Sequence, residues 1–270
     1  MEMKRNEISL DTITCSLCDI MGIKPPKYAD NTCDIMTDYA KRVLGDKKAD
    51  RIFMYNPDAI AQWIYEKYPN LFLETVRRTD IEVPLLSPMP TVTPVCFATM
   101  YSGAQPSEHG ILKYEKPVLT VETIFDALIK AGKKPAIVGF PTCSVTKIFQ
   151  EREMDYYAYN TIEEIHAKVV ELIIEDKHDF IAIHAYNYDS LMHKYGPESP
   201  EALGALKVNV EFYAMFDRLI QKYWRQHNVF MGFAMDHGCH EIETGGGSHG
   251  LEMDEDLNIT HFYKAYVAEN

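Results

Sequence analysis

The chain has 270 residues, of which 46% are hydrophobic, and it carries a formal net charge of −13. This length and composition can fill the core of one large globular domain. The acidic balance argues against a nucleic-acid polymer as a partner, because binding to a phosphate backbone requires a basic surface. No apolar run approaches the ~20 residues needed to cross a bilayer, and the first residues lack the apolar core of a signal peptide. We therefore expect a cytoplasmic protein without a membrane partner.

Residues 1–50 have a mixed, partly helical pattern that is broken at residues 22–26. They contain the motif Cys15-Ser-Leu-Cys18, but no second CxxC follows it and no βαβ pattern surrounds it. We interpret Cys15 and Cys18 as buried thiols near a short N-terminal helix, and we expect all six cysteines to be reduced. Residues 1–50 are interpreted as an N-terminal extension that packs on a single domain covering residues 1–270.

From residue 51 onward, short apolar segments alternate with amphipathic ones. Strands are predicted at residues 51–56, 135–140, 180–184, 229–235 and 259–267. Helices are predicted between them, including one that begins at the Thr161 capping box and a long one that begins at Ser199-Pro200. The proline-rich segment 83–93 is predicted to be a loop or an extended chain. Several strands are apolar throughout, which is typical of burial on both faces, so the sequence predicts a three-layer α/β/α fold with a mostly parallel central sheet.

Aspartates follow three apolar segments of the chain, and histidines follow two of them. These residues are Asp58, Asp189 with His193, and Asp236 with His237. Because the carboxyl ends of parallel strands meet at one edge of an open sheet, these side chains are expected to lie close together. On a helix, Asp189 and His193 would share one face, since they are four residues apart.

A further histidine, His249, lies in the glycine-rich segment Gly245-Gly-Gly-Ser-His249-Gly250, which is flexible enough to bring an imidazole to the site. Each candidate also has an ordinary structural explanation: Asp58 could cap a helix, and Asp189 with His193 could form a solvated helix face. His240 is an alternative to His249 as a ligand. Taken together, three aspartates and three histidines suit two divalent cations, with Zn²⁺ favoured and Mn²⁺ or Fe as alternatives.

Two cations about 4 Å apart are the usual clamp for displacement at phosphorus. Their charge would also admit a small phosphorylated substrate to an acidic protein. The candidate nucleophile is Thr93, which precedes Pro94 in a pattern typical of a helix N-cap. A hydroxyl at a helix N-terminus lies where the helix favours an anion, and metal coordination would activate it. The capping role and the nucleophilic role do not exclude each other.

The order of these motifs resembles the nucleotide pyrophosphatase/phosphodiesterase branch of the alkaline phosphatase superfamily. The resemblance spans roughly residues 51–250 and implies an alkaline phosphatase-like fold. The matching segments are Thr91-Val-Thr93 through Ser102-Gly103, Pro106 through His109-Gly110-Ile111, Asp189 through Gly196-Pro197, Asp236-His237-Gly238 and Ser248-His249-Gly250.

The resemblance also implies roles for these residues. One metal ion would be held by Asp189, His193 and His249. The other would be held by Asp58, Asp236, His237 and the Thr93 oxygen. Attack of Thr93 on phosphorus would give a phospho-threonine intermediate that is then hydrolysed, and both ions in this family are usually zinc.

Two positions depart from the family pattern. Cys96 stands where the family often has an asparagine that helps to hold a phosphate oxygen, and a thiol is a much poorer donor. Pro94 removes the backbone N–H that follows Thr93, which leaves the amides further along the helix turn. We keep Cys96 as a tentative oxyanion residue. The segment between His109 and Asp189 has no room for the large cap domain of the mutase relatives.

The first functional hypothesis is therefore a two-metal phosphodiesterase. The alternatives are a phosphomonoesterase or phosphonate hydrolase on the same core, and a pseudoenzyme that binds metal or phosphate without turnover. Of the remaining histidines, His109 is predicted to close the turn after the nucleophile helix, and His184 is predicted to be a core residue with its hydrogen bonds satisfied. The sequence does not constrain the oligomeric state.

Overall fold

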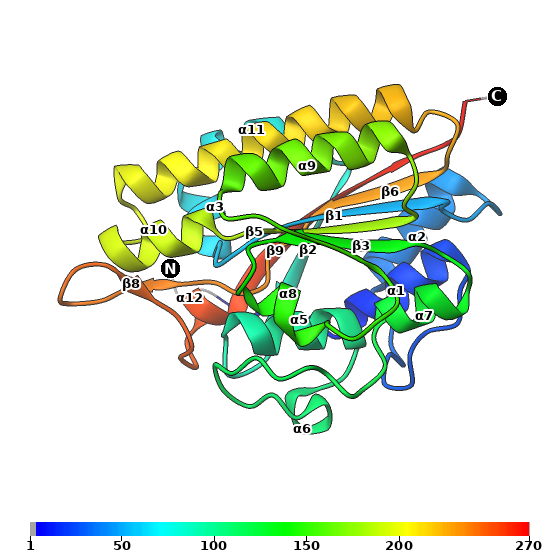
Figure 1. The fold of residues 1–270 in the computed structure, drawn as a ribbon. Helices are drawn as coiled ribbons and strands as arrows, with labels where there is room; N and C mark the ends of the chain where they lie inside the picture. Colours follow the sequence, from blue (N-terminus) through cyan, green and yellow to red (C-terminus); the bar gives the residue numbers. More distant parts are fainter. Residues whose placement is uncertain (1–3, 270) are drawn as a thin grey trace.

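The computed structural model describes residues 4–269 and has three layers, with a seven-stranded sheet between two layers of helices (Figure 1). The strand order is β2-β9-β6-β1-β5-β3-β4. The strand bounds are β1 Arg51–Pro57, β2 Ile81–Leu86, β3 Pro135–Gly139, β4 Asp155–Ala158, β5 Phe180–Ala185, β6 Val229–Phe233 and β9 Asn258–Tyr266. A small separate hairpin consists of β7 His240–Glu241 and β8 Gly247–Ser248.

Helices cover both faces of the sheet. In Figure 1, α9 and α11 lie on one face, and α1, α5, α7 and α8 lie on the other. The longer helices are α1 Thr12–Met21, α2 Asp34–Leu44, α5 Thr93–Ser102, α7 Ile124–Lys130, α9 Ile162–Glu175, α10 Asn187–Tyr195 and α11 Pro200–Tyr223. The shorter ones are α3 Gln62–Lys67, η1 Pro69–Phe72, α4 Leu73–Val76, α6 Pro106–His109, α8 Ser144–Ile148 and α12 Asp254–Leu257. The predicted α/β/α architecture with a mostly parallel sheet is confirmed, and residues 4–269 contain no large cap.

The centre of the sheet is parallel. Strand β1 pairs in parallel with β5 on one side and with β6 on the other, and β3 continues the parallel pairing beyond β5. Every residue of β5 and β6 is buried, as expected for strands covered by helices on both faces. Strand β9 runs antiparallel to both of its neighbours, β2 and β6. The three central strands therefore end at the same edge of the sheet.

Strand β2 includes residues 83–86 of the segment predicted to be a loop or an extended chain, so this part of the segment is extended. Residues 81–86 pair with β9 in an antiparallel register that places Pro84 opposite Thr260. Proline cannot donate a ladder hydrogen bond, but β2 is the edge strand, so its unpaired side tolerates the missing N–H. The remainder of the proline-rich segment connects β2 to α5.

Helices α1 and α2 tie the N-terminal segment to the rest of the chain. The Thr14 hydroxyl of α1 donates to the Met100 carbonyl of α5 over 2.6 Å. The Tyr39 hydroxyl of α2 accepts the Ala265 N–H of β9 over 2.9 Å. Cys15 and Cys18 lie within α1, and all six cysteines are free. Within the described residues, no helix is long and apolar enough to cross a membrane.

Strand β9 carries a fully buried histidine, His261. Its Nε2–H donates to the Met235 carbonyl, which can only accept, so Nδ1 is left to accept from the Tyr263 hydroxyl at 2.7 Å. Burial lowers the pKa of His261 to about 4. The folded protein therefore holds this imidazole neutral at a pH where an unfolded chain would protonate it.

We predict that His261 contributes to acid sensitivity. Because its pKa in the folded state is depressed, stability is lost as the pH falls below about 6.5 and towards 4. At pH 5 this loss amounts to about 2 kcal/mol in the free energy of unfolding. Urea denaturation at pH 7.5 and 5 should show a smaller loss for His261→Gln than for the wild type. Equal losses in the two proteins would contradict this account.

Candidate metal centre

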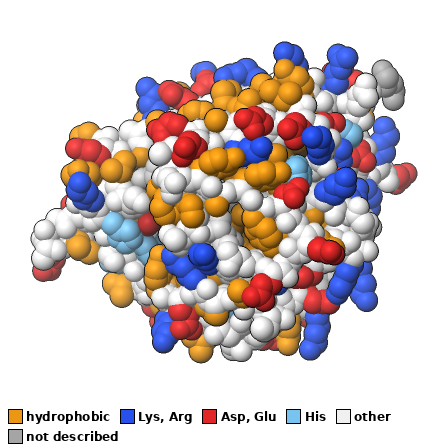
Figure 2. All heavy atoms as spheres, viewed as in Figure 1, with side chains coloured by type: hydrophobic (Ala, Val, Ile, Leu, Met, Phe, Trp, Pro, Cys, Tyr) orange, Lys and Arg blue, Asp and Glu red, His pale blue; other side chains and the backbone are white. Residues whose placement is uncertain are grey.

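The parallel centre of the sheet brings the three predicted aspartates together. Asp58 directly follows β1, Asp189 lies in the first turn of α10 after β5, and Asp236 follows β6. Since β1 lies between β5 and β6, the chain delivers all three to one end of the sheet. In Figure 1 this is the end where α10, α12 and the β7–β8 hairpin lie. Figure 2 shows histidine side chains reaching the surface at that end.

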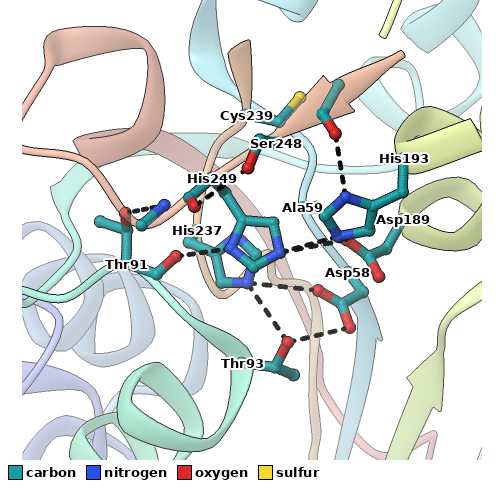
Figure 3. A network of polar contacts seen from close by, with 12 residues as sticks. Asp58, Ala59, Thr91, Thr93, Asp189, His193, His237, Cys239, Ser248 and His249 are labelled. Carbon is teal, nitrogen blue, oxygen red and sulfur yellow. Dashed lines mark hydrogen bonds and ion pairs between the residues drawn. The ribbon is translucent and has the colours of Figure 1, made fainter. Parts of the chain in front are cut away.

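The side chains form two groups, each with ligand atoms that all lie within 4.8 Å of one another. The outer group is Asp189, His193 and His249. In it, Asp189 Oδ1 lies 3.2 Å from His193 Nε2 and 3.5 Å from His249 Nε2, and the two Nε2 atoms are 3.1 Å apart. Figure 3 shows these three side chains pointing toward one another from α10 and from the loop after β8.

The inner group is Asp58, Asp236 and His237, and all three residues are buried. His237 Nε2 lies 3.5 Å from Asp58 Oδ1 and 3.3 Å from Asp236 Oδ2. The Thr93 hydroxyl lies beside this group, 3.5 Å from Asp58 Oδ2 and 3.4 Å from His237 Nε2 (Figure 3). The ring centroids of His237 and His249 are 4.1 Å apart, so the two groups adjoin.

All three histidines turn the same nitrogen away from the site. Their Nδ1 atoms lie 2.8–2.9 Å from backbone carbonyl oxygens, namely those of Gly247 for His193, Gly238 for His237 and Thr91 for His249. A carbonyl oxygen only accepts, so each Nδ1 carries a proton and each neutral ring presents the lone pair of Nε2 to the site. Carbonyl contacts of this kind are typical of metal-binding histidines.

The carboxylates present acceptors to the same space. Asp58 Oδ1, Asp189 Oδ1 and Asp236 Oδ2 are buried and have no hydrogen-bond partner. Lone pairs of nitrogen and oxygen therefore face one another at 3.1–3.5 Å, an arrangement that only a positive charge between them makes favourable. Nitrogen and carboxylate ligands in groups of three match the donors that bind zinc, so both groups are chemically suited to a divalent cation.

Burial shifts the pKa values of all three residues of the inner group. It raises the pKa of Asp58 to about 6, with the charges of Asp236 and Asp189 adding to the effect. It likewise raises the pKa of Asp236 to about 6. Burial also lowers the pKa of His237 to about 4, so this imidazole does not supply the missing positive charge near neutral pH.

The outer group behaves differently because it is partly open to solvent. Burial opposes protonation of His249, but the nearby Asp189 carboxylate raises its pKa to about 9. Burial raises the pKa of Asp189, yet His193 and His249 hold it below its usual range. In this group a proton on an imidazole substitutes for the positive charge that a cation would bring.

The turn after Asp58 is strained. Ala59 has φ 63°, the left-handed region that residues other than glycine rarely occupy. In this conformation its N–H donates to Asp236 Oδ1 over 3.1 Å. The Asp58 N–H donates to the Ala185 carbonyl of β5 over 3.1 Å. The backbone is thus held in a conformation that fixes Asp236 relative to Asp58.

Helix α5 begins differently from the sequence-based prediction. Val92 is the N-cap, Thr93 is the first helical residue and Pro94 the second. The Val95 and Cys96 N–H groups both donate to the Val92 carbonyl, over 3.0 and 3.1 Å. The first-turn amides that follow Thr93 are therefore absent or already bonded, contrary to the expectation that those further along remain available. Cys96 has no exposed surface, and burial raises the pKa of its thiol well above the usual value.

Three further histidines, His240, His109 and His184, have partners of their own. His240 Nδ1 lies 2.7 Å from Asp256 Oδ1, so the structure pairs it with that carboxylate, while His249 joins the outer group. His109 is the last residue of α6, where its Nδ1 accepts the Ile111 N–H over 3.2 Å, and its Nε2 lies 3.1 Å from the Thr99 hydroxyl of α5. His184 is buried in β5 as predicted, but its hydrogen bonds are not satisfied within the core. Its Nε2 lies 2.8 Å from Asp58 Oδ2, a contact that the sequence pattern does not reveal.

The fold is the alkaline phosphatase-like fold that the sequence predicts. The sequence profile of the type I phosphodiesterase/nucleotide pyrophosphatase family matches residues 55–261, and the chain belongs to that family. A search of curated proteins gives no match.

Solved structures with the same fold include murine and human ectonucleotide pyrophosphatase/phosphodiesterase 5. Each has a TM-score of 0.58 and 16% sequence identity, over 72% of this chain and 58% of the other. Phosphonoacetate hydrolase from Sinorhizobium meliloti has a TM-score of 0.51 and 16% identity, over 73% of this chain and 59% of its own. The matched part is thus less than two thirds of each of these proteins.

A glycine directly after His237 makes the inner group sensitive to substitution. A Cβ at Gly238 would lie 2.0 Å from the Glu255 carbonyl oxygen, so Gly238→Ala must displace backbone next to Asp236 and His237. We predict a loss of roughly 2–4 kcal/mol in the free energy of unfolding, measured by urea denaturation. Gly204→Ala is the control, because Gly204 in α11 has nothing within 4 Å of a new Cβ. It should raise stability by about 0.5–1 kcal/mol. Similar effects of the two substitutions would contradict the predicted clash.

Proposed function

We propose that this protein hydrolyses phosphoesters at a site where the inner and outer groups each hold one divalent cation. The observation that carries the proposal is the set of Nε2 lone pairs and unpartnered carboxylate oxygens that face one another in both groups. Cations at these positions would lower the pKa of nearby hydroxyl groups and offset the negative charge of a phosphorus centre. The mixed set of imidazole and carboxylate donors favours zinc, with manganese or iron as alternatives.

In this proposal Thr93 is the nucleophile. Its hydroxyl is nearly buried and lies between Asp58 and His237 at the start of α5, where the helix dipole favours an anion. Its oxygen forms a bond to phosphorus while the bond to the leaving alcohol breaks, which gives a phospho-threonine. Water then attacks phosphorus, releases the phosphate product and returns the Thr93 hydroxyl.

A small phosphodiester or nucleotide-like substrate fits the family. In support, murine ectonucleotide pyrophosphatase/phosphodiesterase 5 was solved as an inactive threonine-to-alanine variant in complex with AMP. The second candidate is a phosphonate hydrolase or phosphomonoesterase, favoured by the similarity to phosphonoacetate hydrolase, which was solved with phosphonoacetate and with phosphonoformate. The third candidate is a pseudoenzyme that binds metal or phosphate without turnover, favoured by the lack of free amides after Thr93 in α5.

The nucleophile is tested with aryl esters. We expect hydrolysis of bis-para-nitrophenyl phosphate that depends on added Zn²⁺ or Mn²⁺ and exceeds hydrolysis of para-nitrophenyl phosphate. Thr93→Ala should lower kcat by at least about a thousandfold, since it removes the attacking oxygen, while Thr93→Ser should keep part of the activity. Metal content and thermal unfolding of both variants serve as controls.

Other results would select between the candidates. Faster turnover of the monoester, or of phosphonoacetate, would replace the diesterase proposal with the second candidate. Bound metal without turnover of any of these esters would favour the pseudoenzyme. Wild-type activity in Thr93→Ala would exclude Thr93 as the nucleophile.

Substitution of Pro94 is expected to raise kcat. Pro94→Ala would restore the N–H next to the nucleophile at the start of α5, where a donor can stabilise charge on a phosphate oxygen. Because removal of one such donor costs about a hundredfold or more in other enzymes, we expect kcat to rise by roughly three- to tenfold. Steady-state kinetics with the diester measure this effect. An unchanged or lower kcat in a variant of normal stability would show that this amide does not face the reacting phosphate.

A further inference from the structure

His184, a buried histidine behind the inner group, makes one side-chain hydrogen bond to that group. His184 Nε2 lies 2.8 Å from Asp58 Oδ2, and both side chains are almost completely buried. A carboxylate oxygen at this distance accepts, so His184 Nε2 carries a proton and donates it to Asp58. Neither His184 nor its neighbours on β5 belongs to the two groups that can hold a cation.

This hydrogen bond gives the two Asp58 oxygens different roles. Oδ2 accepts from His184 and faces the Thr93 hydroxyl at 3.5 Å. Oδ1 has no hydrogen-bond partner and lies 3.5 Å from His237 Nε2, within the inner group. Since the carboxylate is planar, fixing Oδ2 also fixes the direction in which Oδ1 points. The adjacent backbone is held as well, because the Asp58 N–H donates to the Ala185 carbonyl, one residue after His184.

Packing keeps the His184 ring in the orientation that this contact requires. The ring of Phe97 on α5 meets it edge-on, with centroids 5.4 Å apart and planes at 85°. On β3, a Cβ at Gly139 would lie 3.5 Å from His184 Cβ, an ordinary packing distance, so β3 lies against the base of this side chain. The Phe97 ring therefore restricts the rotation of the His184 ring.

We propose that His184 is a positioning residue that orients Asp58 as a ligand of the inner cation and holds it beside Thr93. This inference rests on the proposed two-cation site and adds a residue that none of the metal-binding groups contains. Outer hydrogen-bond partners of metal ligands typically change metal affinity by 10–100-fold when they are removed. The selective effect should fall on the inner group, because the outer group does not include Asp58.

The test compares three substitutions of buried histidines. His184→Phe keeps an aromatic ring but removes the donor, and His184→Gln keeps an N–H donor of similar reach. His166→Phe is the matched control, since His166 is equally buried but its Nε2 contacts the Tyr55 hydroxyl at 2.8 Å, outside both groups. Zn²⁺ affinities are measured by competition with a chromogenic chelator, and the absorption spectrum of the Co²⁺-substituted protein reports ligand geometry. Thermal unfolding monitors the fold of each variant.

We expect the wild type to bind two Zn²⁺ ions and His184→Phe to bind one of them about 10–100-fold more weakly, with an altered Co²⁺ spectrum. His184→Gln should restore most of the affinity, and His166→Phe should keep both sites even if its stability falls. Unchanged affinities in His184→Phe, or an equal loss in His184→Gln, would overturn the role of this hydrogen bond. A wild type that binds no metal would instead refute the proposed function itself.

Discussion

The site depends on carboxylate oxygens and imidazole Nε2 atoms that face one another at one end of the sheet. The parallel pairing of β1 with β5 and β6 forces three carboxylates to one end of the sheet. The hydrogen bonds of the three histidines to backbone carbonyls then direct their Nε2 lone pairs to the same space. Such an arrangement is unfavourable in a buried setting until positive charge enters it, as the raised pKa values of Asp58 and Asp236 show. Cation binding and fold stability should therefore be coupled.

Two N–H donors hold the carboxylates of the inner group in place. The left-handed Ala59 supplies an N–H to Asp236, and His184 supplies one to Asp58, so each inner carboxylate has one anchored and one free oxygen. The free oxygens point to a common space with His237. The outer group is less buried, and the Asp189 carboxylate raises the pKa of both its histidines. The two groups thus use the same residue types under different electrostatic conditions.

Much of this arrangement could be predicted from the sequence. Apolar strands that lack alternation indicate burial on both faces and hence a parallel sheet, and a parallel sheet brings strand-end residues together. That reasoning is sufficient to bring Asp58, Asp189 and Asp236 to one edge. The four-residue spacing of Asp189 and His193, and the glycines around His249, account for the outer group. The division of the residues into two groups is what the family resemblance implies, and their spacing alone does not give it.

Other features depend on tertiary relations that no local pattern encodes. Pro84 argues against a strand until β2 is known to be the edge strand. The contact of His184 with Asp58 requires the register that pairs it with Asn56, because a strand buried on both faces gives no sign of which side chain meets the site. The shortage of free amides after Thr93 follows from Val95 and Cys96 sharing one acceptor, a detail of helix geometry.

The most direct measurement of the central claim is the metal content of the purified protein after dialysis against trace Zn²⁺, with Asp189→Asn and Asp236→Asn as comparisons. The account predicts two ions per chain in the wild type and one in each variant, because each substitution removes a carboxylate from a different group. A wild type without near-stoichiometric metal would contradict it, since the facing acceptors would then be stabilised by protons alone.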